Sequence, residues 1–112
     1  MKLLITLLVT LGISMGSYGA YMTAAQLLER CESVANVDKA VCLGYVQGAV
    51  DTFESVMSLG AWPKNFCIPQ QVTLGQLSKV LVKYLNEHPE DLHYMADNEV
   101  HMAFMKAFPC EK

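Results

Sequence analysis

The sequence predicts an all-α fold class: a small four-helix domain of two antiparallel helical hairpins, cross-linked by two disulfides. First, apolar residues recur three and four positions apart in four separate stretches, which is the period of an α-helix. Second, Thr-x-x-Gln segments begin at Thr23 and Thr73, and this pattern is typical of helix N-termini because both side chains pair with free backbone groups. Third, the four cysteines of this 112-residue chain are an even number, as two disulfides require.

Residues 1–19 have the features of a secretory signal peptide. One positive charge precedes a short apolar block, and small residues follow where a signal peptidase needs them. We expect cleavage after Gly19 or Ala20, which leaves residues 20–112 as the mature domain. The apolar block is too short to span a bilayer of about 30 Å, so an uncleaved anchor is the less favoured alternative.

The first two helices are predicted at about 23–34 and 39–59. Asp38 is placed to cap the second helix, where its negative charge meets the positive end of the helix dipole. Gly60 follows the last apolar position and is expected to end that helix. The apolar face of the second helix comprises Cys42, Tyr45, Val46, Ala49, Phe53, Val56 and Met57.

Gly44 and Gly48 lie four residues apart inside the second helix. Each costs roughly 1 kcal/mol relative to alanine in a helix interior, which suggests that another segment packs closely there. Close packing against a helix of the same chain is the favoured interpretation, and a dimer contact is the alternative.

Residues 61–72 contain two prolines and no helical period, so they are predicted to be an extended connection. We expect it to be held over the core by Trp62, Phe66 and Ile68, and by Cys67.

The third helix is predicted from Thr73 to about Leu85, with an interruption before Pro89. Pro89 suits the first position of the fourth helix, and two acidic residues follow it in the first turn. Pro109 stops this helix. Its buried stripe is predicted to comprise Leu92, Ala96, Val100, Ala103, Phe104 and Ala107.

Short links make helices one and two, and three and four, antiparallel pairs. Cys31 and Cys42 flank the first link, and Cys67 and Cys110 flank the second pair. We therefore predict the pairs Cys31 with Cys42 and Cys67 with Cys110, one of the three connectivities that four cysteines allow.

The composition argues against several function classes. The chain has 8 basic and 11 acidic residues, and loss of Lys2 with the leader makes the net charge about −4. An acidic surface disfavours nucleic acid and anionic membrane as partners. No C-x-x-C pair, H-E-x-x-H pattern or zinc-finger spacing is present, so no metal site and no cofactor are expected.

No catalytic residues and no enzyme activity are expected. His93, Tyr94 and Asp97 could be combined into a triad on paper, but residues so close on one helix rarely converge on a shared pocket. A solvated helix face is the favoured interpretation. Core or subunit packing is expected for the methionines Met95, Met102 and Met105.

Several segments resemble the Rap/Tai immunity proteins of the bacterial type VI secretion system. They cover most of residues 31–110 in the right order. They are Cys42-Leu43-Gly44-Tyr45-Val46-Gln47-Gly48, Phe66-Cys67-Ile68-Pro69, Val72-Thr73-Leu74-Gly75-Gln76-Leu77, Val82-Lys83-Tyr84-Leu85 with His88-Pro89-Glu90, and Ala107-Phe108-Pro109-Cys110.

The resemblance implies a periplasmic helical protein, often a homodimer, that binds and inhibits a peptidoglycan amidase delivered by a neighbouring cell. Such amidases resemble papain-like cysteine peptidases, and the immunity protein blocks the active-site cleft with a loop or a helix end. The alternative is a periplasmic acid-stress chaperone of the Hde type, which shares the small helical, disulfide-bonded build. A secreted enzyme or toxin is the least supported interpretation.

The partner-binding surface is predicted at the link between helices three and four, because a protruding polar corner on a rigid scaffold can enter a cleft. An ordinary helix-helix turn is the alternative. The predicted binding residues are Asn86, Glu87, His88, Glu90, Asp91 and His93.

Overall fold

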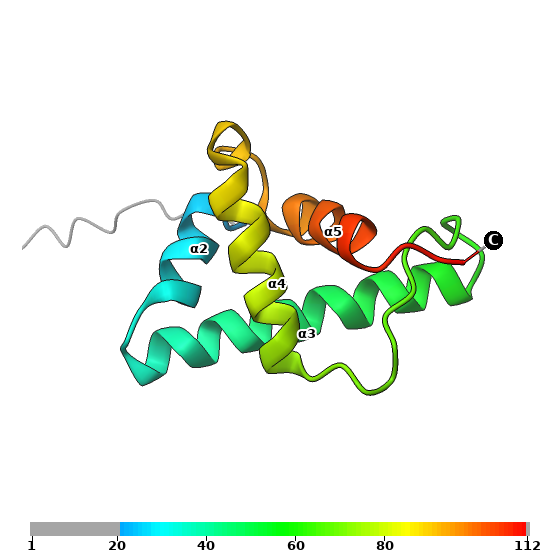
Figure 1. Cartoon of the computed structure of the whole chain (residues 1–112), viewed down its shortest axis with the longest axis horizontal. Coiled ribbons are helices and arrows are strands. Elements are labelled where there is room, and N and C mark those ends of the chain that lie inside the picture. Colours follow the sequence, from blue (N-terminus) through cyan, green and yellow to red (C-terminus); the bar gives the residue numbers. More distant parts are fainter. Residues whose placement is uncertain (1–20, 112) are drawn as a thin grey trace, which may run out of the picture.

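Figure 1 shows the computed structural model, which describes residues 21–111. The predicted signal peptide and its cleavage site lie outside the described residues. Within the described part, four α-helices and one short 3-10 helix form the fold, and the all-α, disulfide-linked fold class is confirmed. The elements are α2 (Ala24–Glu32), α3 (Asn36–Ser58), α4 (Leu74–Glu87), the 3-10 helix η1 (Pro89–Asp91) and α5 (Ala96–Ala107).

Both predicted capping boxes are confirmed. At α2, the Thr23 hydroxyl accepts a hydrogen bond from the Gln26 N–H at 3.2 Å, and the Gln26 side chain accepts one from the Thr23 N–H at 2.9 Å. Thr73 and Gln76 form the same pair at the start of α4, at 3.2 and 2.7 Å. Each box satisfies two backbone donors that a helix start leaves open.

The N-terminus of α3 differs from the prediction, since the helix begins at Asn36 and Asp38 does not cap it. The Asp38 carboxylate instead accepts a hydrogen bond from the Ser33 hydroxyl at 2.7 Å and pairs with Arg30. The Ser33 hydrogen bond, and then the Arg30 pair, lower the pKa of Asp38. Its side chain therefore links the end of α2 to α3. At the other end, Gly60 is confirmed with φ 74°.

The long helix α3 runs along one side of the molecule, α4 crosses it, and α5 lies beside its C-terminal half (Figure 1). The predicted apolar face of α3 is buried at its centre and half-buried at its edges. One core joins all four helices and the 61–72 connection. Its fully buried large side chains are Leu27, Val46, Phe66, Leu81, Leu85, Val100 and Phe104.

Both predicted disulfides are confirmed. Cys31 bonds to Cys42 with a Cα–Cα distance of 5.0 Å, and Cys67 bonds to Cys110 at 4.9 Å. The Cys67 N–H also donates to the Phe108 carbonyl oxygen at 2.8 Å. The second disulfide thus fastens the connection before α4 to the segment after α5.

The connection at 61–72 is held over the core as predicted. Phe66 is fully buried and Ile68 packs against the core. Trp62 is 46% exposed, although its ring stacks on Phe53 with a centroid distance of 6.1 Å.

The prediction that the fourth helix begins at Pro89 is wrong. Residues Pro89–Asp91 form only the 3-10 helix η1, and α5 begins at Ala96. The physical reason is that residues 92–95 pair with the start of α2 instead of continuing a helix: Met95 forms an antiparallel bridge with Thr23. The link between α4 and α5 is consequently longer than predicted.

One packing prediction is also wrong, and another is confirmed in part. A Cβ atom added at Gly44 or Gly48 would meet no atom within 4 Å outside its own helical turn and neighbours, so no segment of the described chain packs closely there. Of the three methionines predicted to pack in the core or between subunits, Met105 packs against the core, whereas Met95 and Met102 are 45% and 46% exposed, so their packing between subunits stays a prediction.

Candidate functional site

The segment 86–95, which we call the corner, projects from the end of α4 and away from α3 (Figure 1). All six predicted partner-binding residues lie in it. His88 and Asp91 are half-buried, and the exposed members are Asn86, Glu87, Glu90 and His93. The structure therefore gathers these side chains on one protrusion, with α4 and α5 as its two supports.

The backbone of the corner is fixed by hydrogen bonds to the start of α2. The Ala24 N–H donates to the Tyr94 carbonyl oxygen, and the Ala25 N–H donates to the Leu92 carbonyl oxygen, each at 2.9 Å. These N–H groups belong to the first turn of a helix, where no intrahelical acceptor exists. The corner thus supplies acceptors for α2, and α2 holds the corner in one conformation.

Aromatic stacking orders the two histidines of the corner. The His88 ring lies over the Tyr84 ring with centroids 4.0 Å apart, and its Nδ1 is 2.7 Å from the Tyr84 carbonyl oxygen. The carbonyl can only accept, so Nδ1 carries the hydrogen and donates it. His93 lies against Tyr94 with centroids 4.2 Å apart. The His88 ring is therefore held by stacking and by a hydrogen bond, whereas the His93 ring contacts Tyr94 and remains exposed.

Two exposed apolar side chains of the corner were not among the predicted binding residues. Tyr94 is 47% exposed and Met95 is 45% exposed. Tyrosine is enriched among the residues that dominate protein interfaces, because it offers a large rigid surface and a polar tip. Both residues directly follow His93, and this position could have identified them as binding residues. They were missed because a helix was predicted through these positions.

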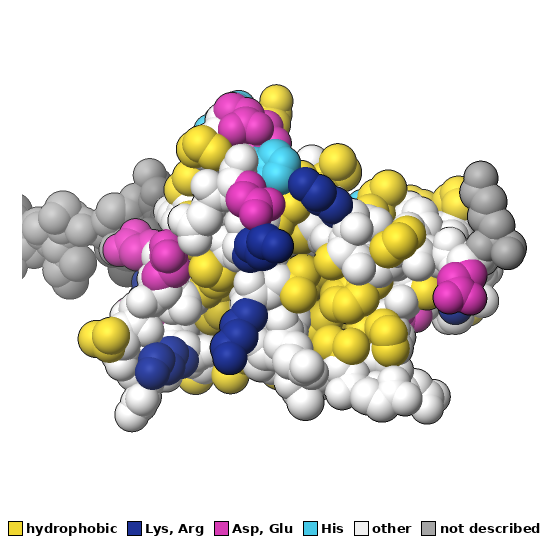
Figure 2. Space-filling model, viewed as in Figure 1, with side chains coloured by type: hydrophobic (Ala, Val, Ile, Leu, Met, Phe, Trp, Pro, Cys, Tyr) yellow, Lys and Arg dark blue, Asp and Glu magenta, His cyan; other side chains and the backbone are white. Residues whose placement is uncertain are grey.

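The corner is acidic. Glu87, Glu90 and Asp91 lie within a stretch of five residues, and one of them, Glu87, pairs with Lys83, whose Nζ is 4.0 Å from the Glu87 carboxylate. Both side chains of that pair are well exposed, so the interaction neutralises little of the charge. Figure 2 shows acidic side chains gathered at the tip above α4. A cleft that receives this corner must tolerate or attract negative charge.

Behind the corner, the structure buries a carboxyl group that sequence reasoning missed. Glu99, in the first turn of α5, is 3% exposed, and its Oε2 has no hydrogen-bond partner. Burial raises the pKa of Glu99 most, and the nearby Asp91 raises it further. His88 acts in the opposite direction, and Glu90 and His93 have smaller effects of opposite sign. Glu99 lies three residues after Ala96 and therefore on the predicted buried face. This spacing is the sequence signal that could have identified it as buried.

Replacement of Glu99 by glutamine is expected to stabilise the protein at pH 7 by about 1 kcal/mol, because the neutral amide removes the extra penalty that burial places on a charged group. Because the folded-state pKa lies above the unfolded value of about 4.3, the folded state holds the proton more tightly, and stability falls as the pH rises between those values. The gain from Glu99→Gln should therefore vanish near pH 4. Thermal unfolding at both pH values measures it.

Comparison of variant and wild type at each pH removes the contribution of His101, whose pKa is lowered by burial. Glu87→Gln, at an exposed carboxylate, is the matched control and should show no such pH-dependent gain. An equal effect of Glu99→Gln at pH 4 and pH 7 would contradict the assignment.

No catalytic arrangement is seen at the corner. His93, Tyr94 and Asp97 are not joined to one another by any side-chain hydrogen bond of residues 21–111. In the same residues, no group of three or more His, Cys, Asp or Glu side chains is arranged to hold a metal ion. None of the helices described is long and apolar enough to cross a membrane.

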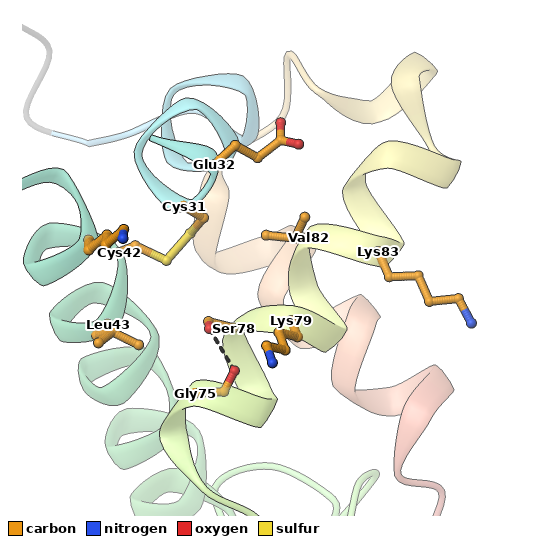
Figure 3. A pocket seen from close by; sticks show the side chains of 10 residues that line it. Cys31, Glu32, Cys42, Leu43, Gly75, Ser78, Lys79, Val82 and Lys83 are labelled. Atoms are coloured by element: carbon orange, nitrogen blue, oxygen red, sulfur yellow. Dashed lines mark hydrogen bonds between the residues drawn. A yellow bond between two sulfur atoms is a disulfide. The ribbon is translucent and has the colours of Figure 1, made fainter. Parts of the chain in front are cut away.

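A second surface feature is an open groove between α3 and α4, with the end of α2 at its upper edge (Figure 3). Its volume is about 660 Å³. Its apolar lining side chains are those of Cys31, Cys42, Leu43 and Val82, and the other lining residues are Glu32, Lys39, Gly75, Ser78, Lys79 and Lys83. We call it the α3–α4 groove. Sequence reasoning did not identify it, because its residues come from three helices.

Comparison with known families gives one match. The model of a family described as Rap1a immunity proteins matches residues 23–110. The match spans all four helices, both disulfides, the corner and the α3–α4 groove. A search of curated proteins found no match.

Proposed function

Because the chain belongs to the Rap1a immunity protein family, we propose that it is exported to the periplasm and there binds and inhibits a peptidoglycan amidase delivered by type VI secretion. The observation that carries this proposal is the family match, which covers nearly the whole of the described domain. An immunity protein acts by forming a complex with its effector, so the proposed activity is binding rather than catalysis.

The corner supports inhibition by occlusion of a cleft. It protrudes, its backbone is fixed by α2, and it exposes Tyr94 and Met95 beside acidic side chains. A rigid protrusion loses little conformational entropy on binding, which favours tight association. The predicted residues at 86–93 are accordingly our proposed inhibitory contacts.

The test is co-expression of the full chain with individual peptidoglycan amidase effectors directed to the periplasm, with cell lysis as the readout. We expect protection against at least one effector. The matched control is a chain without residues 2–19, which should stay in the cytoplasm and fail to protect. Lysis with every amidase, together with suppression of protein aggregation near pH 3, would instead support the acid-stress chaperone.

A homodimer through the outer face of α3 is proposed in addition. This face, opposite the core, consists of Val37, Val41, Gly44, Gly48, Asp51 and Ser55, so it carries one charge, that of Asp51. Val37 is 70% exposed. The solvent side of a helix normally carries several charged and polar residues, so a face with a single charge and two open glycines is suited to close contact with a second helix. A second copy can present the same face in a two-fold arrangement.

Gly48→Arg is expected to convert the dimer to a monomer without unfolding the chain. Within one chain the added side chain meets no atom within 4 Å at its Cβ, whereas across a close helix contact it would clash and introduce a buried charge. Light scattering coupled to size-exclusion chromatography measures the mass, and circular dichroism checks the fold. Gly75→Arg, at an exposed glycine of α4, is the control and should leave the mass unchanged. A wild-type monomer at 100 µM would refute the dimer.

A further inference from the structure

The α3–α4 groove combines an apolar floor with two lysines that have no ionic partner. Lys39 comes from α3 and Lys79 from α4, and both are exposed. The salt bridges found in residues 21–111 are Arg30–Asp38 and Lys83–Glu87, so neither lysine takes part in one. This is notable in a chain that carries a net charge of −3.

The floor of the groove is unusually apolar for an exposed surface. The Cys31–Cys42 disulfide crosses between α2 and α3 at one side, Leu43 extends from α3, and Val82 extends from α4 (Figure 3). A volume of about 660 Å³ is within the range of sites that bind small ligands, and it is ample for one large side chain. Burial of such a side chain there would remove apolar surface of both molecules from water.

The charges of the groove favour an anionic occupant. Lys39 and Lys79 line an opening whose lining includes one carboxylate, that of Glu32, which accepts a hydrogen bond from Asn86 at 3.4 Å. Lys83 contributes its aliphatic part to the wall while its amino group points away from the groove (Figure 3). The lining of the groove therefore includes two amino groups that have no salt-bridge partner in residues 21–111 against one carboxylate, which is a net positive balance.

The groove continues directly into the corner. Residues 75–83 of α4 line the groove, and Asn86, in the last turn of the same helix, bonds to Glu32 at its upper edge. Figure 2 shows basic side chains over the face where α3 and α4 cross and acidic ones at the tip above them. The corner and the groove therefore adjoin through the Glu32–Asn86 hydrogen bond, so one partner surface can cover both.

We infer that the α3–α4 groove is a second contact site for the effector and takes an apolar side chain flanked by carboxylates. This inference rests on the proposed function and deepens it, because it specifies the chemistry of the effector surface beside the cleft. The effector must then present opposite charges to two adjacent regions, with positive potential toward the corner and carboxylates toward Lys39 and Lys79. Such charge patterning excludes wrong partners as well as attracting the right one.

The first experiment uses three peptide probes with the full chain: acetyl-Glu-Leu-Glu-Phe-Glu-amide and the two versions in which every Glu is Gln or Lys. Binding is followed by the amide chemical shifts of the isotope-labelled protein. We expect the Glu peptide to shift residues of the groove and to bind at least tenfold more tightly than the Gln peptide. The Lys peptide should not bind. The affinity of the protein for the Glu peptide should also fall with added salt.

The Lys39→Glu/Lys79→Glu variant should bind the Glu peptide at least tenfold more weakly. Lys64→Glu/Lys106→Glu is the matched control, since it makes the same change of charge at exposed positions outside the groove, and it should bind as wild type. The inference would be overturned if the wild type bound the Glu and Gln peptides equally well. It would also be overturned if the Lys39→Glu/Lys79→Glu variant and the control variant bound the Glu peptide equally well. Displacement of the Glu peptide by micromolar myristate would likewise overturn it and would assign the groove to an amphiphile.

The lysis assay separates failure of this inference from failure of the proposed function. If wild type protects against an amidase and Lys39→Glu/Lys79→Glu binds that amidase as tightly as wild type does, the groove assignment fails and the immunity function stands. If wild type protects against none while the Glu peptide still requires both lysines, the immunity function fails and the effector assignment of the groove fails with it, leaving only a site for acidic peptides.

Discussion

Replacement of Cys67 and Cys110 by alanine is expected to lower the free energy of unfolding by about 4 kcal/mol. The disulfide closes a loop with a sequence separation of 43 residues, and a chain-entropy estimate for a loop of this length gives that value. Small domains are commonly stable by only about 5–15 kcal/mol. Urea denaturation followed by circular dichroism, without reducing agent, measures the change.

The Cys31→Ala/Cys42→Ala variant is the matched comparison. That bond spans 11 residues, so its loss should cost about 3 kcal/mol, less than loss of the longer loop. The Cys67 disulfide also fixes the segment that carries the fully buried Phe66, so its removal should loosen the 61–72 connection as well. A larger loss from the Cys31–Cys42 variant would contradict the loop-length argument.

The parts of the fold that sequence reasoning predicted depend on interactions within a few residues. The Thr23 and Thr73 capping boxes and the turn at Gly60 are local, and each was confirmed. The apolar stripes were also predicted, because a helix that buries one face must repeat every three or four residues. The pairing of cysteines followed from these helices and their links.

The errors occur where distant segments satisfy each other. Pro89 and the acids after it form a good helix start, yet the carbonyl groups of Leu92 and Tyr94 are taken up by the first turn of α2, nearly 70 residues away in sequence. No local pattern indicates that α2 needs acceptors at that place. These tertiary hydrogen bonds outweigh the local helix preference at Pro89, so α5 begins at Ala96 instead.

The two candidate binding surfaces also differ in how far they could be predicted from the sequence. The corner is one continuous segment between two helices, so its polar residues could be predicted from the sequence. The α3–α4 groove depends on how α2, α3 and α4 pack, and Lys39 and Lys79 lie 40 positions apart. Glu99 was missed because periodicity places residues on a face but does not reveal which polar group that face will bury.

Combined replacement of Glu87, Glu90 and Asp91 by alanine is expected to weaken binding to the amidase by about 100-fold or more, as truncation of several central interface charges does. Glu87 and Glu90 are exposed, and Asp91 is half-buried. The Asp91 N–H donates to the His88 carbonyl oxygen through the backbone, so alanine preserves that turn. The loss should therefore reflect missing interface contacts rather than unfolding. Calorimetric titration with the amidase found in the lysis assay measures it.

The matched control is Glu29→Ala/Glu54→Ala/Glu111→Ala, which removes the same charge outside the corner and should bind as wild type. Salt dependence adds a second criterion, because removal of the corner charges should make the remaining affinity less sensitive to ionic strength. Tyr94→Ala, which removes the exposed ring without changing the charge, should also weaken binding. Wild-type affinity in the corner triple variant, with the fold intact, would exclude these carboxylates from the interface and move the inhibitory contact to another part of the surface.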